Sequence, residues 1–283
     1  MTTQGTGTTE PGATPTVAVL GAGVMGGTLV AGLRAGGWPP AAVVVADPDA
    51  AKAAATADEH GATAAPDNRA AVSAADVVLL AVKPGAVPAV LADLAPVLRP
   101  GALVVSVAAG VPLAVYESAL PAGTPVVRVM PNTPALVGKG ASATAPGVAA
   151  GDEHLALVER MLAATGVVVR VAEKDMDAVT ALSGSGPAYV FYVIDALAEA
   201  GVLLGLPRDL ATTLAVATVE GAGAMVAQTG EHPAVLRERV SSPGGTTVAG
   251  VAALDAHAVR AGLVAGVRAA AERSRELGRP AGA

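Results

Sequence analysis

Apolar and polar positions follow two different patterns, one in each half of the chain. From Thr16 to about Ala172, short runs rich in Val and Leu alternate with alanine-rich stretches typical of helices. This alternation predicts a parallel β-sheet covered by helices. The expected strands are Thr16–Leu20, Val43–Ala46, Asp76–Val82, Ala102–Val107, Val126–Met130 and, closing the domain, Val167–Val171.

After about Lys174 the pattern is helical throughout. The expected helices are Tyr189–Leu204, Arg208–Gln228, Ala234–Val240, Thr246–Ala256 and His257–Leu277. Prolines 187, 207 and 233 lie where these helices begin, and glycines 205, 230 and 278 lie where they end. A helix that is apolar on nearly every side must be buried, and so small a helical domain has little interior of its own. We therefore expect its helices to pack against a second copy of the chain.

Composition narrows the class of protein. The 283 residues suggest two domains, and the net charge of −6 without any basic run argues against nucleic-acid binding. Cysteine is absent, which excludes disulfides, thiolate metal sites and a catalytic thiol. No apolar run reaches the roughly 20 uninterrupted residues of a membrane span, and no signal peptide is recognisable. We expect a disordered tail over residues 1–15 and a cytoplasmic protein.

The first glycine cluster, VAVLGAGVMGG, directly follows the first expected strand and opens a helix. Gly21, Gly23 and Gly26 have the G-x-G-x-x-G spacing of dinucleotide-binding turns. In such turns the first glycine permits the tight bend, the second admits the pyrophosphate and the third allows close packing of helix on strand. A glycine-rich turn without a ligand is the alternative. The second strand ending in an acidic residue about 20 residues later favours dinucleotide binding.

That acidic residue is Asp47, in the segment ADPDAAKAAA. A carboxylate here accepts hydrogen bonds from the ribose 2′-hydroxyl and repels a 2′-phosphate, which favours NADH over NADPH. The nearest following cation is Lys52, and no arginine lies close. The competing interpretation is that Asp47 caps the next helix.

Further candidates lie at other strand ends, where ligands bind in open α/β sheets. Lys83, in LLAVKPGAV, either reaches a ligand or points to solvent, with Pro84 beginning a helix. Asn132, between two prolines in RVMPNTPA, either donates to a carboxamide or substrate or shapes the turn. The segment SVAAGV also follows a strand.

Other chemistries lack their residues. The four histidines have no H-E-x-x-H spacing, so a zinc hydrolase is not expected, and LSGSGPAY is not a G-x-S-x-G elbow. Lysine is confined to positions 52, 83, 139 and 174, which argues against hydroxyacid dehydrogenases with a helical catalytic lysine. A reductase with little need for a protein acid remains. A cyclic iminium that carries a carboxylate suits it, because such a substrate needs orientation and an anion site.

The segment VSSPGGTTVAG offers that anion site. Gly244 and Gly245 leave backbone N–H groups uncovered, and Thr246 and Thr247 begin the next helix. A helix N-terminus with exposed amides and hydroxyls binds an anion without a basic residue. A hydroxyl can also hydrogen-bond to an imine or an amine nitrogen. Taken alone, the segment equally fits an ordinary helix cap after a Pro-Gly turn.

From about Thr16 to Leu277 the chain resembles the pyrroline-5-carboxylate reductase family. The segments that carry the resemblance, in order, are GAGVMG, AVKPGAV, SVAAGV, RVMPNTPA, LSGSGPAYVF, GLPR, TGEHPAVLRERV and SSPGGTTVAGVAALD. The resemblance implies a Rossmann-type dinucleotide-binding domain over 16–173 and an all-helical dimerisation and substrate domain over 174–283. It also implies interleaved homodimers, which often form larger rings, with an active site shared between subunits.

The resemblance also implies roles for individual residues. Thr247 and Ser242 are the candidate catalytic residues, with Thr247 on the imine nitrogen. Ser242 and the amides of Gly245 and Thr246 would hold the carboxylate, and Glu173 would lie near the substrate. The residues implied at the NAD(P)H cofactor are Gly21, Gly23, Met25, Gly26, Asp47, Asn68, Ala81, Lys83, Pro84, Ala108, Ala109 and Asn132. Many relatives carry residues that suit NADPH at the end of the second strand, and Asp47 departs from them.

Two alternatives stay open. One is a nucleotide-binding module, such as a redox sensor, that turns over no imine, because fold does not fix function. The other is a reductase for a six-membered piperideine carboxylate, since one methylene changes binding by only about 1–3 kcal/mol.

Overall fold

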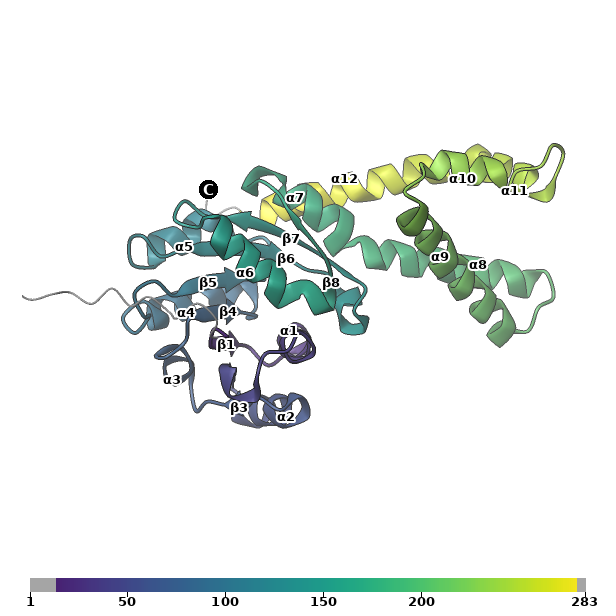
Figure 1. Cartoon of the computed structure of the whole chain (residues 1–283). Coiled ribbons are helices and arrows are strands. Elements are labelled where there is room, and N and C mark those ends of the chain that lie inside the picture. The colour runs from purple at the N-terminus through teal and green to yellow at the C-terminus, as the bar shows by residue number, and fades with distance from the viewer. Residues whose placement is uncertain (1–13, 279–283) are drawn as a thin grey trace, which may run out of the picture. The chain divides into compact units, whose positions relative to one another are not determined.

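The computed structural model describes residues 14–278, which form two compact units. One unit comprises 14–184 together with 273–278, and the other comprises 185–272. The expected disordered tail lies outside the described residues except for Thr14 and Pro15. Figure 1 shows strands and helices mixed in the first unit and helices alone in the second.

The first unit is built on one eight-stranded sheet in the order β3-β2-β1-β4-β5-β6-β7-β8. The strands are β1 (Val17–Leu20), β2 (Val43–Ala46), β3 (Thr63–Ala64), β4 (Val77–Leu80), β5 (Leu103–Ser106), β6 (Val126–Met130), β7 (Gly140–Pro146) and β8 (Gly166–Arg170). All six predicted strands are confirmed, within two residues at each end.

The expectation of a parallel sheet holds for β1 to β6 and is wrong at β7, which runs antiparallel to β6. Strand β8 then pairs parallel to β7. Two strands were not predicted. β3 has only two residues, and β7 (GASATAP) consists of small residues without the β-branched apolar run that marks a buried strand.

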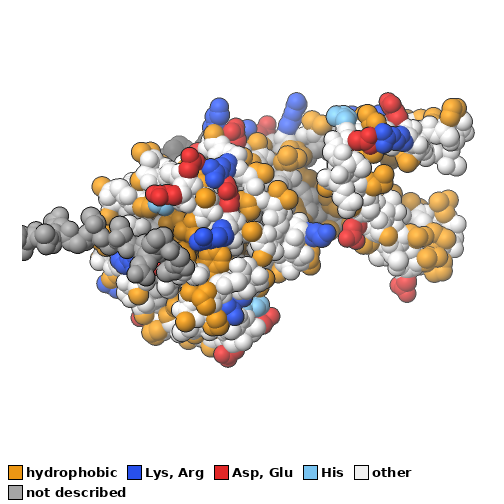
Figure 2. Space-filling model, viewed as in Figure 1, with side chains coloured by type: hydrophobic (Ala, Val, Ile, Leu, Met, Phe, Trp, Pro, Cys, Tyr) orange, Lys and Arg blue, Asp and Glu red, His pale blue; other side chains and the backbone are white. Residues whose placement is uncertain are grey.

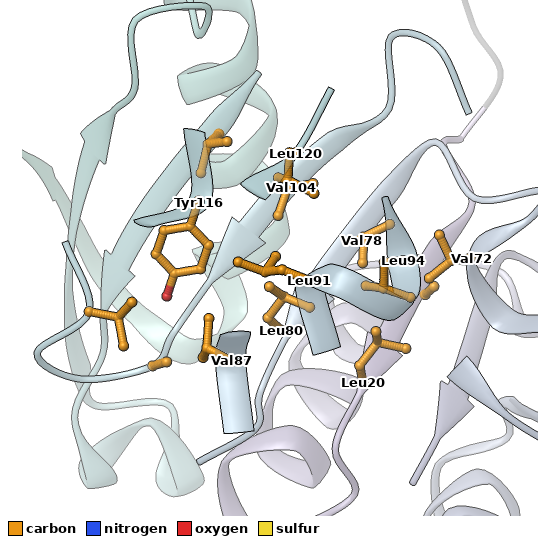
Figure 3. Close-up of a cluster of buried hydrophobic side chains, with 14 of the residues drawn as sticks. Leu20, Val72, Val78, Leu80, Val87, Leu91, Leu94, Val104, Tyr116 and Leu120 are labelled. Carbon is orange, nitrogen blue, oxygen red and sulfur yellow. The ribbon is translucent and has the colours of Figure 1, made fainter. Parts of the chain in front are cut away.

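Helices cover both faces of this sheet (Figure 1). They are α1 (Val24–Ala35), α2 (Ala50–His60), α3 (Asn68–Val72), α4 (Val87–Leu94), α5 (Leu113–Ala119), α6 (Asp152–Leu162) and α7 (Met176–Val179). Successive strand residues point to opposite faces, so Val17 and Val19 pack with α1 and α6, whereas Leu20 packs with α3, α4 and α5. Figure 3 shows the cluster on the side of α3, α4 and α5, to which the buried Leu80, Leu91 and Tyr116 belong. This burial fixes the strand ends on which ligand sites are built.

The second unit is entirely helical. Its helices are α8 (Gly186–Leu203), α9 (Arg208–Thr229), α10 (Pro233–Arg239), α11 (Thr246–Ala256) and α12 (Val259–Leu277), whose last turn belongs to the first unit. The five predicted helices are confirmed, but α8 begins three residues early, with Pro187 in its first turn. Helix α12 begins two residues late, because Ala258 adopts a left-handed φ of 55° that separates it from α11.

The helical unit has almost no interior. The buried apolar side chains between 185 and 272 are four alanines, at positions 198, 211, 215 and 271. Helices α8 and α9 cross closely, since a Cβ on Gly201 would lie 2.9 Å from the Ala211 Cβ. Large apolar side chains are exposed along the unit, among them Phe191, Leu203 and Leu214. Figure 2 shows hydrophobic side chains gathered over it.

Two helical stretches, Glu173–Leu203 and Arg208–Thr229, are long and apolar enough to cross a membrane by length and composition. Helices α11 and α12 would count as a third if the bent pair formed one span. This differs from the expectation from sequence that no stretch qualifies. The sequence-based expectation required an uninterrupted apolar run. A helix interrupted by a few charges, such as Asp195 and Glu199, still has a high mean hydropathy.

Candidate active site

The glycine turn between β1 and α1 has the shape that a dinucleotide requires. Gly21 has φ of +103°, and a Cβ there would lie 2.6 Å from the Ala81 carbonyl oxygen. A Cβ on Gly26 would overlap the Gly21 carbonyl oxygen, so helix and strand pack closely only with glycine. Gly23, the N-cap of α1, has open space in the direction of a Cβ, with nothing within 4 Å. The turn is therefore tightly packed at Gly21 and Gly26 and open at Gly23, as a pyrophosphate site needs.

The start of α1 is free to bind an anion. No side chain caps the helix, and the first turn contains no acidic residue. Val24 is 72% exposed there, while Met25 is half-buried and packs against the core on the α1 side. The unpaired amides and the positive end of the helix dipole favour a phosphate group at this point.

Asp47 is part of the glycine turn and does not cap α2. Its Oδ2 accepts a hydrogen bond from the Ala22 amide at 2.8 Å, and its Oδ1 accepts one from the Asp49 amide at 2.9 Å. Asp49 is the N-cap of α2, and its Oδ1 accepts from the Ala51 amide at 3.1 Å. Lys52 forms an exposed ion pair with Asp49 at 3.6 Å. The capping interpretation thus applies to Asp49, and Asp47 lies directly after β2 beside the glycine turn.

Other candidates lie at the ends of β4 and β5 and at the start of α3. Ala81 directly follows β4, and the exposed Lys83 precedes a short 3₁₀ turn that begins at Pro84. The Lys83 backbone carbonyl accepts from the Ala86 amide, but its side chain has no hydrogen bond or ion pair to any residue between 14 and 278, so the ammonium group is available to a ligand. After β5, Ala108 is buried and Ala109 is exposed. Asn68 is the half-buried first residue of α3, and the capping carboxylate is that of its neighbour Asp67.

Asn132 shapes the loop after β6. Its Nδ2 donates to the Ser183 carbonyl at 3.0 Å, and its Oδ1 accepts from the Ala141 amide at 2.8 Å. Ser183 belongs to a π-helical turn, Thr180–Gly184, which lies against β6 because a Cβ on Gly184 would overlap the Met130 side chain. Both ends of the Asn132 amide are engaged by backbone, which favours the turn-shaping interpretation. Of the two serines in LSGSGPAY, Ser183 lies in this π turn and Ser185 directly precedes α8.

The start of α11 is the second candidate for an anion site. Gly245 is its N-cap without any side-chain cap, and Gly244 has φ of +67°. The Gly245 amide donates to the Ser242 carbonyl at 2.9 Å, and a Cβ on Gly245 would overlap the Ser242 hydroxyl. Within the described chain, the amides and hydroxyls of Thr246 and Thr247 have no hydrogen-bond partner. A helix start with free amides and two hydroxyls is therefore present, without the side-chain cap of an ordinary helix start.

Glu173 is held by its own chain. Its Oε1 accepts from Arg128 Nη1 at 2.7 Å and from the Leu113 amide at 3.1 Å. On the same face of the sheet the Ser106 hydroxyl pairs with the Tyr116 hydroxyl at 2.7 Å. Burial raises the pKa of Tyr116, and the Ser106 hydrogen bond and the charge of Arg128 partly oppose this shift.

Sequence reasoning missed Ser106, Tyr116 and Arg128. Arg128 lies in the otherwise apolar strand VVRVM, and a cation predicted inside a buried strand must have a partner. That requirement was the available signal, but the pattern of positions did not identify Glu173, 45 residues away, as the partner.

Together, the open sheet, the glycine turn at β1 and the acidic residue after β2 define a nicotinamide-dependent oxidoreductase. Comparison with known proteins agrees. Residues 16–110 match a family model described as NADP oxidoreductase coenzyme F420-dependent, and residues 173–277 match one described as pyrroline-5-carboxylate reductase dimerisation.

Relatives that match nearly the whole chain identify its family. A pyrroline-5-carboxylate reductase of Corynebacterium melassecola is 46% identical over 267 residues, covering 93% of this chain and 99% of that protein. A solved pyrroline-5-carboxylate reductase from Coxiella burnetii is 35% identical with a TM-score of 0.90, covering 95% of this chain and all of that one. The Plasmodium falciparum pyrroline carboxylate reductase, solved with NADP bound, is 28% identical with a TM-score of 0.84 over 94% and 98% of the two chains. The chain belongs to the pyrroline-5-carboxylate reductase family.

Proposed function

We propose that this protein reduces 1-pyrroline-5-carboxylate to L-proline with NAD(P)H, the last step of proline biosynthesis. The observation that carries the proposal is the uncapped start of α11, where free amides offer an anion site without a basic residue and the Thr247 hydroxyl lies beside them. A protonated cyclic imine with a carboxylate needs such a site and no strong protein acid. Membership of the family supplies the specific substrate.

The residues at α11 divide the work. The Thr247 hydroxyl hydrogen-bonds the ring nitrogen, as acceptor from the iminium and from the amine that replaces it. The Ser242 hydroxyl and the amides of Gly245 and Thr246 hold the carboxylate. In the balanced reaction the C=N bond of the iminium gains one hydride at carbon, its π electrons become the nitrogen lone pair, and the cofactor leaves oxidised.

The glycine turn and its neighbouring strand ends hold the cofactor, which supplies the hydride when bound. Backbone or small side-chain contacts to the cofactor come from Gly21, Gly23, Met25, Gly26, Ala81, Pro84, Ala108 and Ala109. Asn68 lies on the adenosine side of the cofactor, and Lys83 and Asn132 lie toward its reacting end. A nicotinamide cofactor of either kind fits this turn. We favour NADH, because the Asp47 carboxylate accepts from a 2′-hydroxyl and repels a 2′-phosphate.

The exposed apolar faces of 185–272 favour a homodimer with interleaved helices. Several such dimers then assemble into a larger ring. Burial of these side chains against a second copy, and not against lipid, accounts for their exposure in the single chain. We propose that α11 of one copy completes the cofactor site of its partner, that residues 174–283 function as the dimerisation and substrate domain, and that the enzyme is cytoplasmic.

The test is steady-state oxidation of NADH and of NADPH with 1-pyrroline-5-carboxylate, with proline identified as the product. Turnover with either cofactor supports the proposal. Turnover only with the six-membered piperideine carboxylate assigns a different ring. Cofactor binding without turnover of either imine would favour a redox sensor and contradict the proposal.

A further inference from the structure

Two hydrogen-bonded pairs of polar side chains, together called the network here, lie next to the segment 107–113, which connects β5 to α5. Ser106 and Arg128 are directly paired residues of β5 and β6, so their side chains lie on the same face of the sheet. Ser106 bonds Tyr116 of α5, and Arg128 bonds Glu173. Ser106 is fully buried and Arg128 is 5% exposed, which makes this the polar part of an otherwise apolar core.

The network holds the 107–113 segment near both ends. At one end the Ala108 amide donates to the Ser106 hydroxyl at 3.2 Å. At the other end the Leu113 amide donates to Glu173 Oε1 at 3.1 Å. These two bonds satisfy backbone donors that no strand or helix partner reaches.

Between these two hydrogen bonds, the segment also packs against the last turn of α12. Gly110 has φ of +75°, and a Cβ there would lie 3.6 Å from the Leu277 Cβ in the last turn of α12. That turn is itself fixed, because the buried Ser274 hydroxyl donates to Asp177 Oδ1 at 2.6 Å. The backbone of segment 107–113 is therefore held by Ser106, by Glu173 and by the last turn of α12.

The position of the segment gives this shape a consequence. In this sheet the pyrophosphate turn follows β1 and the ribose carboxylate Asp47 follows β2, so the other end of the dinucleotide extends over the ends of β4 and β5. The segment 107–113 follows β5 and carries the exposed Ala109.

We infer that Glu173 and Ser106 are positioning residues that hold segment 107–113 in the shape that binds the nicotinamide end of the cofactor. This inference rests on the proposed cofactor site. It gives Glu173 a role through the Leu113 amide and no contact with the substrate.

The energetics of the ion pair support a positioning role. A buried ion pair contributes little net stability, and an apolar pair of the same volume is often as stable. Glu173 even leaves its Oε2 buried without a hydrogen-bond partner among the described residues. What an apolar pair cannot do is accept the Leu113 N–H, and Glu173 Oε1 does this while Arg128 holds it in place.

The experiment compares Glu173→Met with Glu159→Met, and Ser106→Ala with Ser118→Ala, in the full-length protein. Glu159 also pairs with an arginine, Arg170, but on the surface, and Ser118 bonds a helix carbonyl on the exposed side of α5. The readouts are the dissociation constant of NADH and NADPH from cofactor fluorescence without substrate, KM for the cofactor, kcat and the thermal midpoint.

We expect Glu173→Met and Ser106→Ala to weaken binding of the reduced cofactor about tenfold, which is the size of one lost charged or buried hydrogen bond. KM for the cofactor rises in parallel while kcat at saturation falls less, and both control variants stay within about twofold of the wild type. The double variant Arg128→Met/Glu173→Met recovers thermal stability relative to Glu173→Met, because no buried charge is left unpaired. It does not recover cofactor affinity.

Unchanged cofactor affinity in folded Glu173→Met and Ser106→Ala would overturn the inference. So would recovery of affinity in the double variant, because that result would make the pair purely stabilising. The double variant also serves if Glu173→Met does not fold. Because binding is measured without substrate, a wild type that binds cofactor but does not reduce the imine would refute the proposed function and leave this comparison intact.

Discussion

The Ala22 amide donates a 2.8 Å hydrogen bond to Asp47 Oδ2, which ties the end of β2 to the glycine turn after β1. The carboxylate therefore has a fixed position beside the turn, and Asp49, two residues later, takes over the capping of α2. One aspartate is available to select the cofactor and the other supports a helix, so the two can be separated by mutation.

Asp47→Ser should shift cofactor preference toward NADPH. The serine hydroxyl no longer repels a 2′-phosphate, and the bidentate acceptor for a 2′-hydroxyl is lost. We expect the ratio of kcat/KM for NADH to that for NADPH to fall by about tenfold or more, in line with about 1.4 kcal/mol for one charged contact. Steady-state kinetics with both cofactors measure the ratio.

Asp49→Ala is the matched control for this prediction. Loss of the N-cap should lower the free energy of unfolding by about 1 kcal/mol and leave the cofactor ratio unchanged. If Asp49→Ala changed the ratio and Asp47→Ser did not, Asp47 would have no part in selecting the cofactor.

Gly23→Ala and Gly26→Ala should fail in different ways. A methyl group at Gly23 meets no atom within 4 Å, so the variant folds normally and loses cofactor affinity because the methyl occupies the approach of the pyrophosphate. At Gly26 the methyl overlaps the Gly21 carbonyl oxygen, so that variant should be strongly destabilised. Circular dichroism and cofactor titration separate the two effects. Wild-type cofactor affinity in Gly23→Ala would place the pyrophosphate elsewhere.

Thr247→Ala should lower kcat by about 10² while the cofactor dissociation constant stays the same, because a positioned hydrogen-bonding group acts mainly in the transition state. Thr246→Ala is the control, since only the Thr246 amide is assigned to the carboxylate and alanine keeps it. Single-turnover reduction of the imine compares the two variants. Equal loss in both would show that the threonine side chains shape the helix start and do not contact the ring nitrogen.

Leu214→Glu should convert the protein to a monomer without turnover. Leu214 is 49% exposed on α9, in a unit whose buried apolar side chains are four alanines, and a carboxylate there opposes burial against a second copy. Val148→Glu, at a 96% exposed apolar side chain of the other unit, should keep the wild-type mass and activity. Light scattering at micromolar concentration reads the mass. A folded wild-type monomer would refute the dimer.

Tyr116 should make the free energy of unfolding fall at alkaline pH. Burial raises its pKa in the folded chain above the ordinary 10.0, so the folded state keeps a proton that the unfolded state releases. Its contribution is complete below pH 10 and decreases as the pH rises above it. Denaturant titrations of the wild type and Tyr116→Phe should therefore converge or cross above about pH 10. A stability difference independent of pH would contradict the raised pKa.

The sequence was sufficient for the elements that depend on local pattern. The apolar runs located six strands, and Pro and Gly located the helix ends, because these residues act on their own neighbours. β7 escaped detection because its stability comes from antiparallel pairing with β6 and not from the residues Gly140–Pro146 themselves.

The long-range polar contacts could not be predicted from one sequence. Nothing in the spacing links Arg128 to Glu173, or Asn132 to the Ser183 carbonyl, since the sheet and the π turn bring these residues together. The choice between Asp47 and Asp49 as the cap of α2 likewise depended on a difference of two residues that only the backbone geometry settles. The glycine turn was predictable because each glycine is required by a local constraint: a tight bend, space for the pyrophosphate, or close packing of helix on strand.

The most direct test of the central claim follows a deuterium label from the cofactor into the product. Wild-type enzyme is supplied with 1-pyrroline-5-carboxylate and cofactor deuterated at the hydride position, and the proline is analysed by mass spectrometry and NMR. The account predicts proline with one deuterium, on the δ-carbon that was the imine carbon. Unlabelled proline, or no proline despite cofactor binding, would contradict hydride transfer to this imine.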